Sequence, residues 1–97
     1  MFEVIESIND RIYVPKEDIS QYLNILESSI NDFIKNDSRD IIVDFNTLQV
    51  IDSLTLAALI RFKRKLSQEG RDLKLINYND NILRVIELSG LDDFLLG

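Results

Sequence analysis

Hydrophobic and polar positions along the chain change their period several times, and each change marks an expected element. Residues 2–8 alternate loosely and predict an edge strand, and after a turn residues 11–14 form a second short β-prone run. Pro15 ends this run because it cannot donate to a sheet. From about residue 16 to residue 35, apolar side chains recur at steps of three and four, which predicts an amphipathic helix.

The rest of the chain alternates between strand-like and helix-like patterns. The expected elements are a buried central strand over 40–45, a connector over 46–52, a helix over 54–69 closed by Gly70, a strand over 73–76, a third helix over 82–88 capped by Asn79, Asp80 or Asn81, and an apolar tail over 91–96. We expect the tail to pack back on the core.

This order of elements predicts the fold class. Strands that alternate with helices favour right-handed crossovers and a largely parallel sheet, while the first two strands can form a hairpin. We therefore expect an α/β fold with a mixed four- to five-stranded sheet and helices mainly on one face. With 97 residues the chain has room for one domain, which we expect to span residues 1–97.

Charge and composition narrow the class of partner. The net charge of −6 argues against nucleic acid, because binding to phosphates normally needs a basic face. No apolar run approaches the roughly 20 residues that cross a bilayer, and the acidic start does not resemble a signal peptide. The absence of cysteine fits a reducing compartment. We expect a cytoplasmic protein without direct membrane insertion.

The available side chains limit the chemistry. The sequence lacks His, Cys and Trp, which removes imidazole acid–base catalysis, thiol nucleophiles and the usual zinc sites, and it has no glycine-rich phosphate loop. Asp44 and Asp52 follow expected strand ends and could hold Mg²⁺, as in a receiver domain, or could serve as a turn aspartate and a residue just before a helix cap. We favour the second interpretation, and expect no enzyme activity, no cofactor and no metal.

Asp52-Ser53, directly before a helix, is the most informative pair. A serine at this point is commonly the N-cap of the helix, since its oxygen can accept from an early backbone N–H. The same place suits a phosphate, because a helix N-terminus presents free N–H groups and a partial positive charge. Ser53 is therefore either a plain cap or a modification site that the fold tolerates.

The helix that follows has two expected faces. At about 100° per residue, one apolar stripe turns toward the sheet and comprises Leu56, Leu59, Ile60, Phe62 and Leu66. The outward set comprises Leu54, Ala57, Ala58, Arg61, Arg64 and Lys65. Small residues and an exposed leucine next to Ser53 favour a protein interface, although the same residues also suit an ordinary solvated helix face.

Residues 40–70, DIIVDFNTLQVIDSLTLAALIRFKRKLSQEG, resemble the core of the STAS family, which includes sulphate transporters and anti-sigma factor antagonists. The shared pattern is an apolar strand that ends in Asp, a short connector, and Asp-Ser at the start of a helix. RDLKLINYNDNILRVIELSGLDDFL resembles the family's later strand and capped third helix. With the helix from residue 16, the resemblance covers nearly the whole chain.

The resemblance implies a function. In bacterial anti-sigma factor antagonists the serine after that Asp is phosphorylated by a partner that is both anti-sigma factor and serine kinase, and a serine phosphatase removes the phosphate. Ser53 occupies this position after Asp52. The implied module is switched by phosphate on Ser53 and binds through Asp52, Ser53, Leu54, Ala57, Ala58 and Arg61.

The resemblance leaves an alternative open. Related STAS subunits dock on the ATPase of a lipid-transport ABC complex without phosphorylation, and often carry Thr after the Asp. The present chain also departs from the antagonist pattern, which often has Ser or Thr and then Gly after the serine, and another Gly two residues further on. Leu54, Thr55 and Ala57 stand at these positions and make the helix start bulkier.

Overall fold

The computed structural model describes all 97 residues, and its strands form one mixed sheet in the order β1-β2-β3-β4. Strand β1 (Phe2–Glu6) pairs antiparallel with β2 (Asp10–Pro15) as a hairpin. Strands β3 (Asp40–Asp44) and β4 (Leu73–Ile76) continue the sheet in parallel. The expected mixed sheet is confirmed, with four strands.

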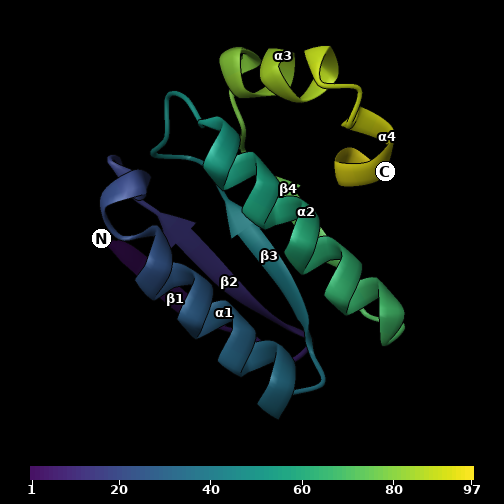
Figure 1. Cartoon of the computed structure of the whole chain (residues 1–97). Helices are drawn as coiled ribbons and strands as arrows, with labels where there is room; N and C mark the ends of the chain where they lie inside the picture. The colour runs from purple at the N-terminus through teal and green to yellow at the C-terminus, as the bar shows by residue number, and fades with distance from the viewer.

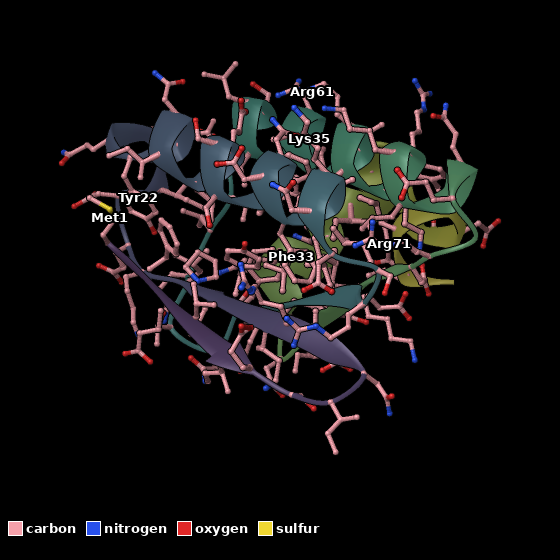
Figure 2. All side chains as sticks on the ribbon, turned by 90° about the horizontal axis from the view of Figure 1, so that it is seen from below. Met1, Tyr22, Phe33, Lys35, Arg61 and Arg71 are labelled. Atoms are coloured by element: carbon pink, nitrogen blue, oxygen red, sulfur yellow. The ribbon has the colours of Figure 1, made fainter.

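Two long helices cover one face of this sheet (Figure 1). They are α1 (Leu23–Asn36), which joins β2 to β3, and α2 (Ser53–Gln68), which joins β3 to β4. Alternate strand residues point toward them, as the buried Tyr13, Ile41 and Val43 show. Figure 2 shows the helices and the strands as two layers with apolar side chains between them. The expected covering of mainly one face is therefore confirmed.

The end of the chain packs beside α2 and β4 (Figure 1). Helix α3 (Asp80–Leu88) is capped by Asn79, whose Oδ1 accepts from the backbone N–H of Ile82 at 2.9 Å. The expected apolar tail forms a short helix, α4 (Asp92–Leu96), and its Leu95 is buried in the core. The tail thus packs back as expected.

The expected helix over 16–35 starts later than its pattern indicates. The chain first makes the 3₁₀ turn η1 (Ile19–Gln21), and α1 begins only at Leu23. Asp18 has a left-handed backbone with φ 59°, and Tyr22 has φ −129°, so neither lies in a continuous helix. Ile19 and Tyr22 are nevertheless buried, which explains why their spacing mimics a helix turn.

Three arginines surround Phe33 at the end of the sheet where β2, β3 and β4 begin. The guanidinium carbons of Arg11, Arg39 and Arg71 lie 4.4, 5.3 and 5.8 Å from the ring centre of Phe33. Arg71 also donates to the backbone oxygens of Ile34 and Arg39 at 2.8 and 2.7 Å, which ties the end of α1 to the start of β3. Figure 2 shows Phe33 between the layers, with Arg71 nearby. We call these three residues the arginine cluster.

Two carboxylates neutralise the outer part of the arginine cluster. Glu6 accepts two hydrogen bonds from Arg11, at 2.7 and 2.9 Å, and Asp37 accepts two from Arg39, both at 3.0 Å. These hydrogen bonds from the arginines hold the pKa of Glu6 and of Asp37 below its ordinary value. The cluster is therefore built from charges that pair within the chain.

None of the helices has the length and apolar composition that a membrane crossing requires.

Candidate functional site

Helix α2 begins at the carboxyl end of the sheet, and Asp52 rather than Ser53 caps it. The Oδ1 atom of Asp52 accepts from the backbone N–H of Thr55 at 2.8 Å, and Ser53 is the first residue of the helix. The expectation of a cap at Ser53 was therefore wrong by one residue. The physical reason is the extended backbone of Asp52 (φ −99°, ψ 176°), which lets its carboxylate reach the backbone N–H of Thr55 in the first turn.

The cap also fixes the charge of Asp52. The hydrogen bond from the Thr55 backbone N–H lowers the pKa of the Asp52 carboxyl below its ordinary value. Asp52 is therefore ionised at neutral pH, and it stands directly before the exposed side chain of Ser53. A free hydroxyl next to a fixed carboxylate is accessible at the surface of the domain.

The connector before α2 is anchored, so the position of Ser53 is defined. Leu48 and Ile51 are buried, and the hydroxyl of Thr47 donates to the backbone oxygen of Pro15 at 2.9 Å. The side-chain amide of Asn79 donates to the backbone oxygen of Gln49 at 2.9 Å. The connector is thus tied to β2 and to the start of α3.

Several expected interface residues lie on the outer side of α2. Leu54 is 63 % exposed, Ala57 is half-buried, and Arg61 is exposed and donates to Glu27 of α1 at 2.8 Å. Figure 2 labels Arg61 on the helix layer, away from the sheet. Together with Asp52 and Ser53, these residues form one continuous stretch of surface, which we call the α2 face.

Ala58 does not belong to the α2 face, contrary to the expectation from the helical pattern. It is only 1 % exposed and lines a small internal void with Leu23, Leu26 and Ile30 of α1. The physical reason is that α1 packs alongside α2, so the buried stripe extends further toward α1 than a sheet alone would require. A small side chain at this position allows the two helices to approach.

Thr55 is a buried residue that was not predicted from the sequence. It is 2 % exposed, and its hydroxyl makes no hydrogen bond of ordinary geometry, although it lies near enough to the Asp52 carboxylate to help lower the pKa of that group. A polar residue one turn into a helix gives no sequence signal for burial, because threonine is common on exposed helix faces. Thr55 lines the same internal void as Ala58.

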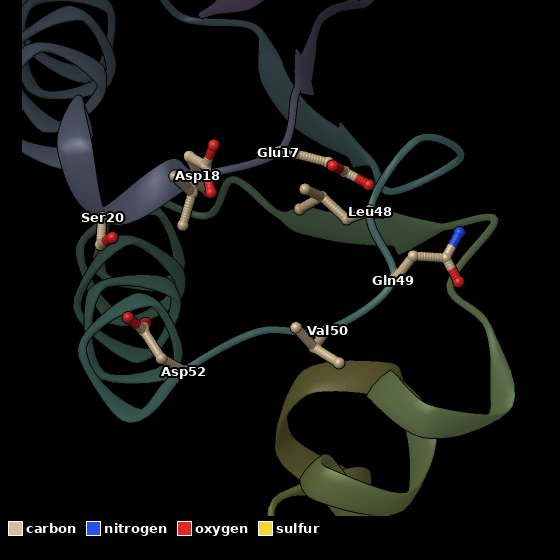
Figure 3. A pocket seen from close by; sticks show the side chains of 8 residues that line it. Glu17, Asp18, Ser20, Leu48, Gln49, Val50 and Asp52 are labelled. Atoms are coloured by element: carbon tan, nitrogen blue, oxygen red, sulfur yellow. The ribbon is translucent and has the colours of Figure 1, made fainter.

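A groove of about 320 Å³ lies beside the start of α2 (Figure 3). Its lining comes from the turn at the start of η1 and from the connector, and comprises Glu17, Asp18, Ile19, Ser20, Leu48, Gln49, Val50 and Asp52. We call it the acidic groove. Apart from Asp52, these residues were not predicted from the sequence, in which the only available signal was the adjacent acidic pair Glu17-Asp18.

The two carboxylates of the alternative metal site, Asp44 and Asp52, are both engaged in local hydrogen bonds. Asp44 accepts from the backbone N–H of Asn46 at 3.0 Å and from the Asn77 amide at 3.1 Å, as a turn aspartate does. Asp52 is engaged in capping. No group of three or more acidic side chains is arranged to hold a metal ion.

Comparison with solved structures shows the same fold in known regulators. SpoIIAA, an anti-sigma factor antagonist, in its unphosphorylated form superposes with a TM-score of 0.86 at 17 % identity, covering 99 % of this chain and 86 % of that one. The phosphorylated form of Bacillus SpoIIAA gives 0.79 at 17 % identity, covering 99 % and 89 %. A putative anti-sigma factor antagonist from Thermotoga maritima gives 0.83 at 19 % identity, covering 98 % and 83 %.

Sequence comparison provides the family. No curated protein sequence is similar enough to count as a relative. The family profile of the STAS domain, however, matches residues 5–96. This match covers β2, β3 and β4, both long helices and the exposed start of α2, and so the chain belongs to the STAS domain family.

Proposed function

We propose that this chain is a non-enzymatic, cytoplasmic signalling module of the anti-sigma factor antagonist type. It binds an anti-sigma factor that is also a serine kinase, and phosphate on Ser53 switches this binding. A serine phosphatase restores the unphosphorylated form. The observation that carries the proposal is the exposed Ser53 at the first residue of α2, directly after the capping Asp52, in a STAS fold.

The surroundings of Ser53 support modification. Its side chain is exposed, as entry into a kinase active site requires, and the connector that positions it is anchored at Leu48 and Ile51. The start of α2 offers free backbone N–H groups, whose partial positive charge tolerates a phosphate. The fold can therefore accept the modification without unfolding.

The switch follows from the charge of the phosphate. It adds about −1.5 to −2 charges at neutral pH. The helix dipole offsets part of this cost within the domain, but a partner surface shaped for a neutral hydroxyl must desolvate the dianion or separate from it. A loss of about 3 kcal/mol would weaken binding by about two orders of magnitude.

The decisive experiment compares variants of Ser53 against the captured partner. The wild-type chain is used in a pull-down with mass spectrometry, which identifies the kinase and detects phosphate on Ser53. Calorimetry should then show about a hundredfold weaker binding for Ser53→Asp and nearly unchanged binding for Ser53→Ala. The melting temperature of both variants should remain close to that of the wild type, because the position is exposed.

Ser67→Asp is the matched control. Ser67 is an exposed serine near the other end of α2, so the same charge is added to the same helix away from Ser53. This variant should bind like the wild type. If Ser53→Asp binds as tightly as Ser67→Asp, the phosphate switch is wrong, and a constitutive STAS subunit docked on a transport ATPase becomes the better account.

A further inference from the structure

The two edges of the sheet differ in what covers them. The β4 edge is closed within the chain, because α4 packs against this strand and the ammonium of Lys63 donates to the backbone oxygen of Leu73 at 3.0 Å. Strand β1 forms the other edge, far from α3 and α4, and β2 is its only hydrogen-bonded neighbour (Figure 1). An uncovered strand edge is a template for pairing with another strand.

The backbone groups of β1 that point outward are fixed by its pairing with β2. The N–H of Ser7 donates to the oxygen of Asp10, and the N–H of Lys16 donates to the oxygen of Met1, both at 3.0 Å. Because hydrogen-bonded pairs alternate along an antiparallel ladder, the odd-numbered residues of β1 bond to β2. The N–H and C=O groups of the even-numbered residues therefore point away from the sheet, and these residues are Phe2, Val4 and Glu6.

This outward edge matches a second copy of itself about Val4. When two copies of β1 are placed antiparallel and centred on this residue, Val4 lies opposite Val4 of the second copy and Phe2 lies opposite Glu6. Both kinds of pair bring outward N–H and C=O groups face to face, as hydrogen-bonded antiparallel pairs require. In this register Glu3 lies opposite Ile5, so no glutamate faces another glutamate.

Exposed apolar side chains gather on the same strand. Met1, Val4, Ile5 and Ile8 are four of the eight large apolar side chains that are exposed in the whole chain. Met1 and Ile8 lie at opposite ends of β1, so antiparallel pairing would bring Met1 of one copy close to Ile8 of the other. The same arrangement would cover Val4, and these side chains would supply the apolar part of an interface.

The glutamates of β1 do not prevent this pairing. Glu3 forms an ion pair with Lys16 at 3.2 Å, and Glu6 forms one with Arg11 at 2.7 Å, so the charges at the edge are balanced within each chain. The general repulsion between two chains of net charge −6 remains. Salt screens this repulsion, and association through β1 should therefore strengthen as the ionic strength rises.

We propose that the outer edge of β1 binds a second copy of this chain, and that antiparallel pairing of the two β1 strands joins two four-stranded sheets into one. The contact of five residues on each strand is small, so the dimer should be weak, with a Kd on the order of 0.1 mM. Helix α2 follows β3 and is separated from this edge by β2, so both copies would keep the α2 face free. The proposal does not depend on the phosphate switch.

Sedimentation equilibrium of the wild type and two variants tests the surface. Val4→Lys places two ammonium groups opposite each other at the two-fold axis, and Val50→Lys adds the same charge in place of another exposed valine. We expect a dimer population that grows with protein up to about 1 mM and with NaCl from about 0.05 to about 0.5 M. It should be lost in Val4→Lys and kept in Val50→Lys. A wild-type chain that stays monomeric, or a dimer that Val4→Lys weakens no more than Val50→Lys, would overturn the proposal.

Amide exchange with solvent, measured by NMR on the wild-type chain, tests the register and needs no variant. The N–H groups of Phe2, Val4 and Glu6 should exchange about fourfold more slowly at about 1 mM than at about 0.02 mM protein, because the dimer would hydrogen-bond them. The N–H groups of Glu3 and Ile5 already bond to β2 and should change much less. Equal rates at both concentrations for the three outward N–H groups would overturn the proposal. Slowing confined to the α2 face would also overturn it and would assign self-association to that face.

Discussion

The charged side chains at the two ends of the parallel strands differ in whether they are paired within the chain. Where the strands begin, each member of the arginine cluster has a carboxylate or backbone partner and stacks near Phe33. Where the strands end, Glu17, Asp18 and Asp52 line a groove with no counter-ion. The first arrangement is complete within the chain, and the second leaves charges available to a partner.

This difference separates stability from recognition. Ion pairs and hydrogen bonds that close within the chain hold α1, β3 and β4 together, so their loss should appear in unfolding experiments. Unpaired surface charges contribute little to stability, but they govern association with a partner. Variants at the start of the strands should therefore change the free energy of unfolding, and variants at the end of the strands should change the affinity for a partner.

The largest expected effect is at Arg71. Its side chain is only 7 % exposed, and Arg71→Met would leave the backbone oxygens of Ile34 and Arg39 without their donor. We expect a loss of about 2–3 kcal/mol in the free energy of unfolding, measured by urea denaturation. Affinity for the partner, measured on the folded variant, should stay within about twofold, since the residue is remote from the α2 face. If Arg71→Met were as stable as the wild type, the arginine cluster would not contribute to the stability of the fold.

The elements could be predicted from the sequence because their signals are local. The period of apolar residues gave β3 and α2, and Gly70, with a φ of 71° just after the end of α2, supplied the expected left-handed stop. The start of α1 could not be found this way, because Ile19 and Tyr22 are buried with helical spacing although their backbone is not helical.

The candidate site was only partly predictable, and the reason is its long-range origin. Asp52, Ser53 and Leu54 are neighbours in the sequence, so their pattern could be recognised. The acidic groove instead brings the turn at Glu17 and Asp18 next to the connector, some thirty residues later. Ala58 was misplaced for the same reason, because the packing of α1 against α2 is not encoded in the periodicity of α2 alone.

The next effect is loss of the cap at the start of α2. Asp52→Ala removes the acceptor for the Thr55 backbone N–H and should cost about 1 kcal/mol, whereas Asp52→Asn should keep most of the cap. Urea denaturation measures both. The two variants both lose the carboxylate, so equal weakening of partner binding by both would assign the effect to charge rather than to the helix start.

A smaller effect concerns the stability of the fold at low pH. Arg39 holds the pKa of Asp37 below its ordinary value, so this carboxylate contributes stability that is fully present above the unfolded pKa of about 3.9 and is lost as the pH falls through the folded pKa. Asp37→Asn should therefore be less stable than the wild type at pH 7, and the difference should narrow below about pH 4. Urea midpoints over this range measure it. A constant difference at all pH values would contradict the role of this ion pair.

The smallest effect tests the one buried side-chain polar atom that makes no hydrogen bond of ordinary geometry. The hydroxyl of Thr55 makes no hydrogen bond of ordinary geometry, so Thr55→Val exchanges it for a methyl group that suits the apolar side chains around it, and loses only its weak influence on the Asp52 carboxylate. We expect a gain of about 0.5–1 kcal/mol, seen as a higher melting temperature, because an unpaired buried polar group carries a desolvation cost. Thr47→Val is the matched control, since that hydroxyl donates to the Pro15 oxygen at 2.9 Å and its removal should destabilise the fold. If both variants lose stability equally, the Thr55 hydroxyl has a hydrogen-bond partner. The contrast between paired groups at one end of the strands and unpaired groups at the other would then not extend into the core.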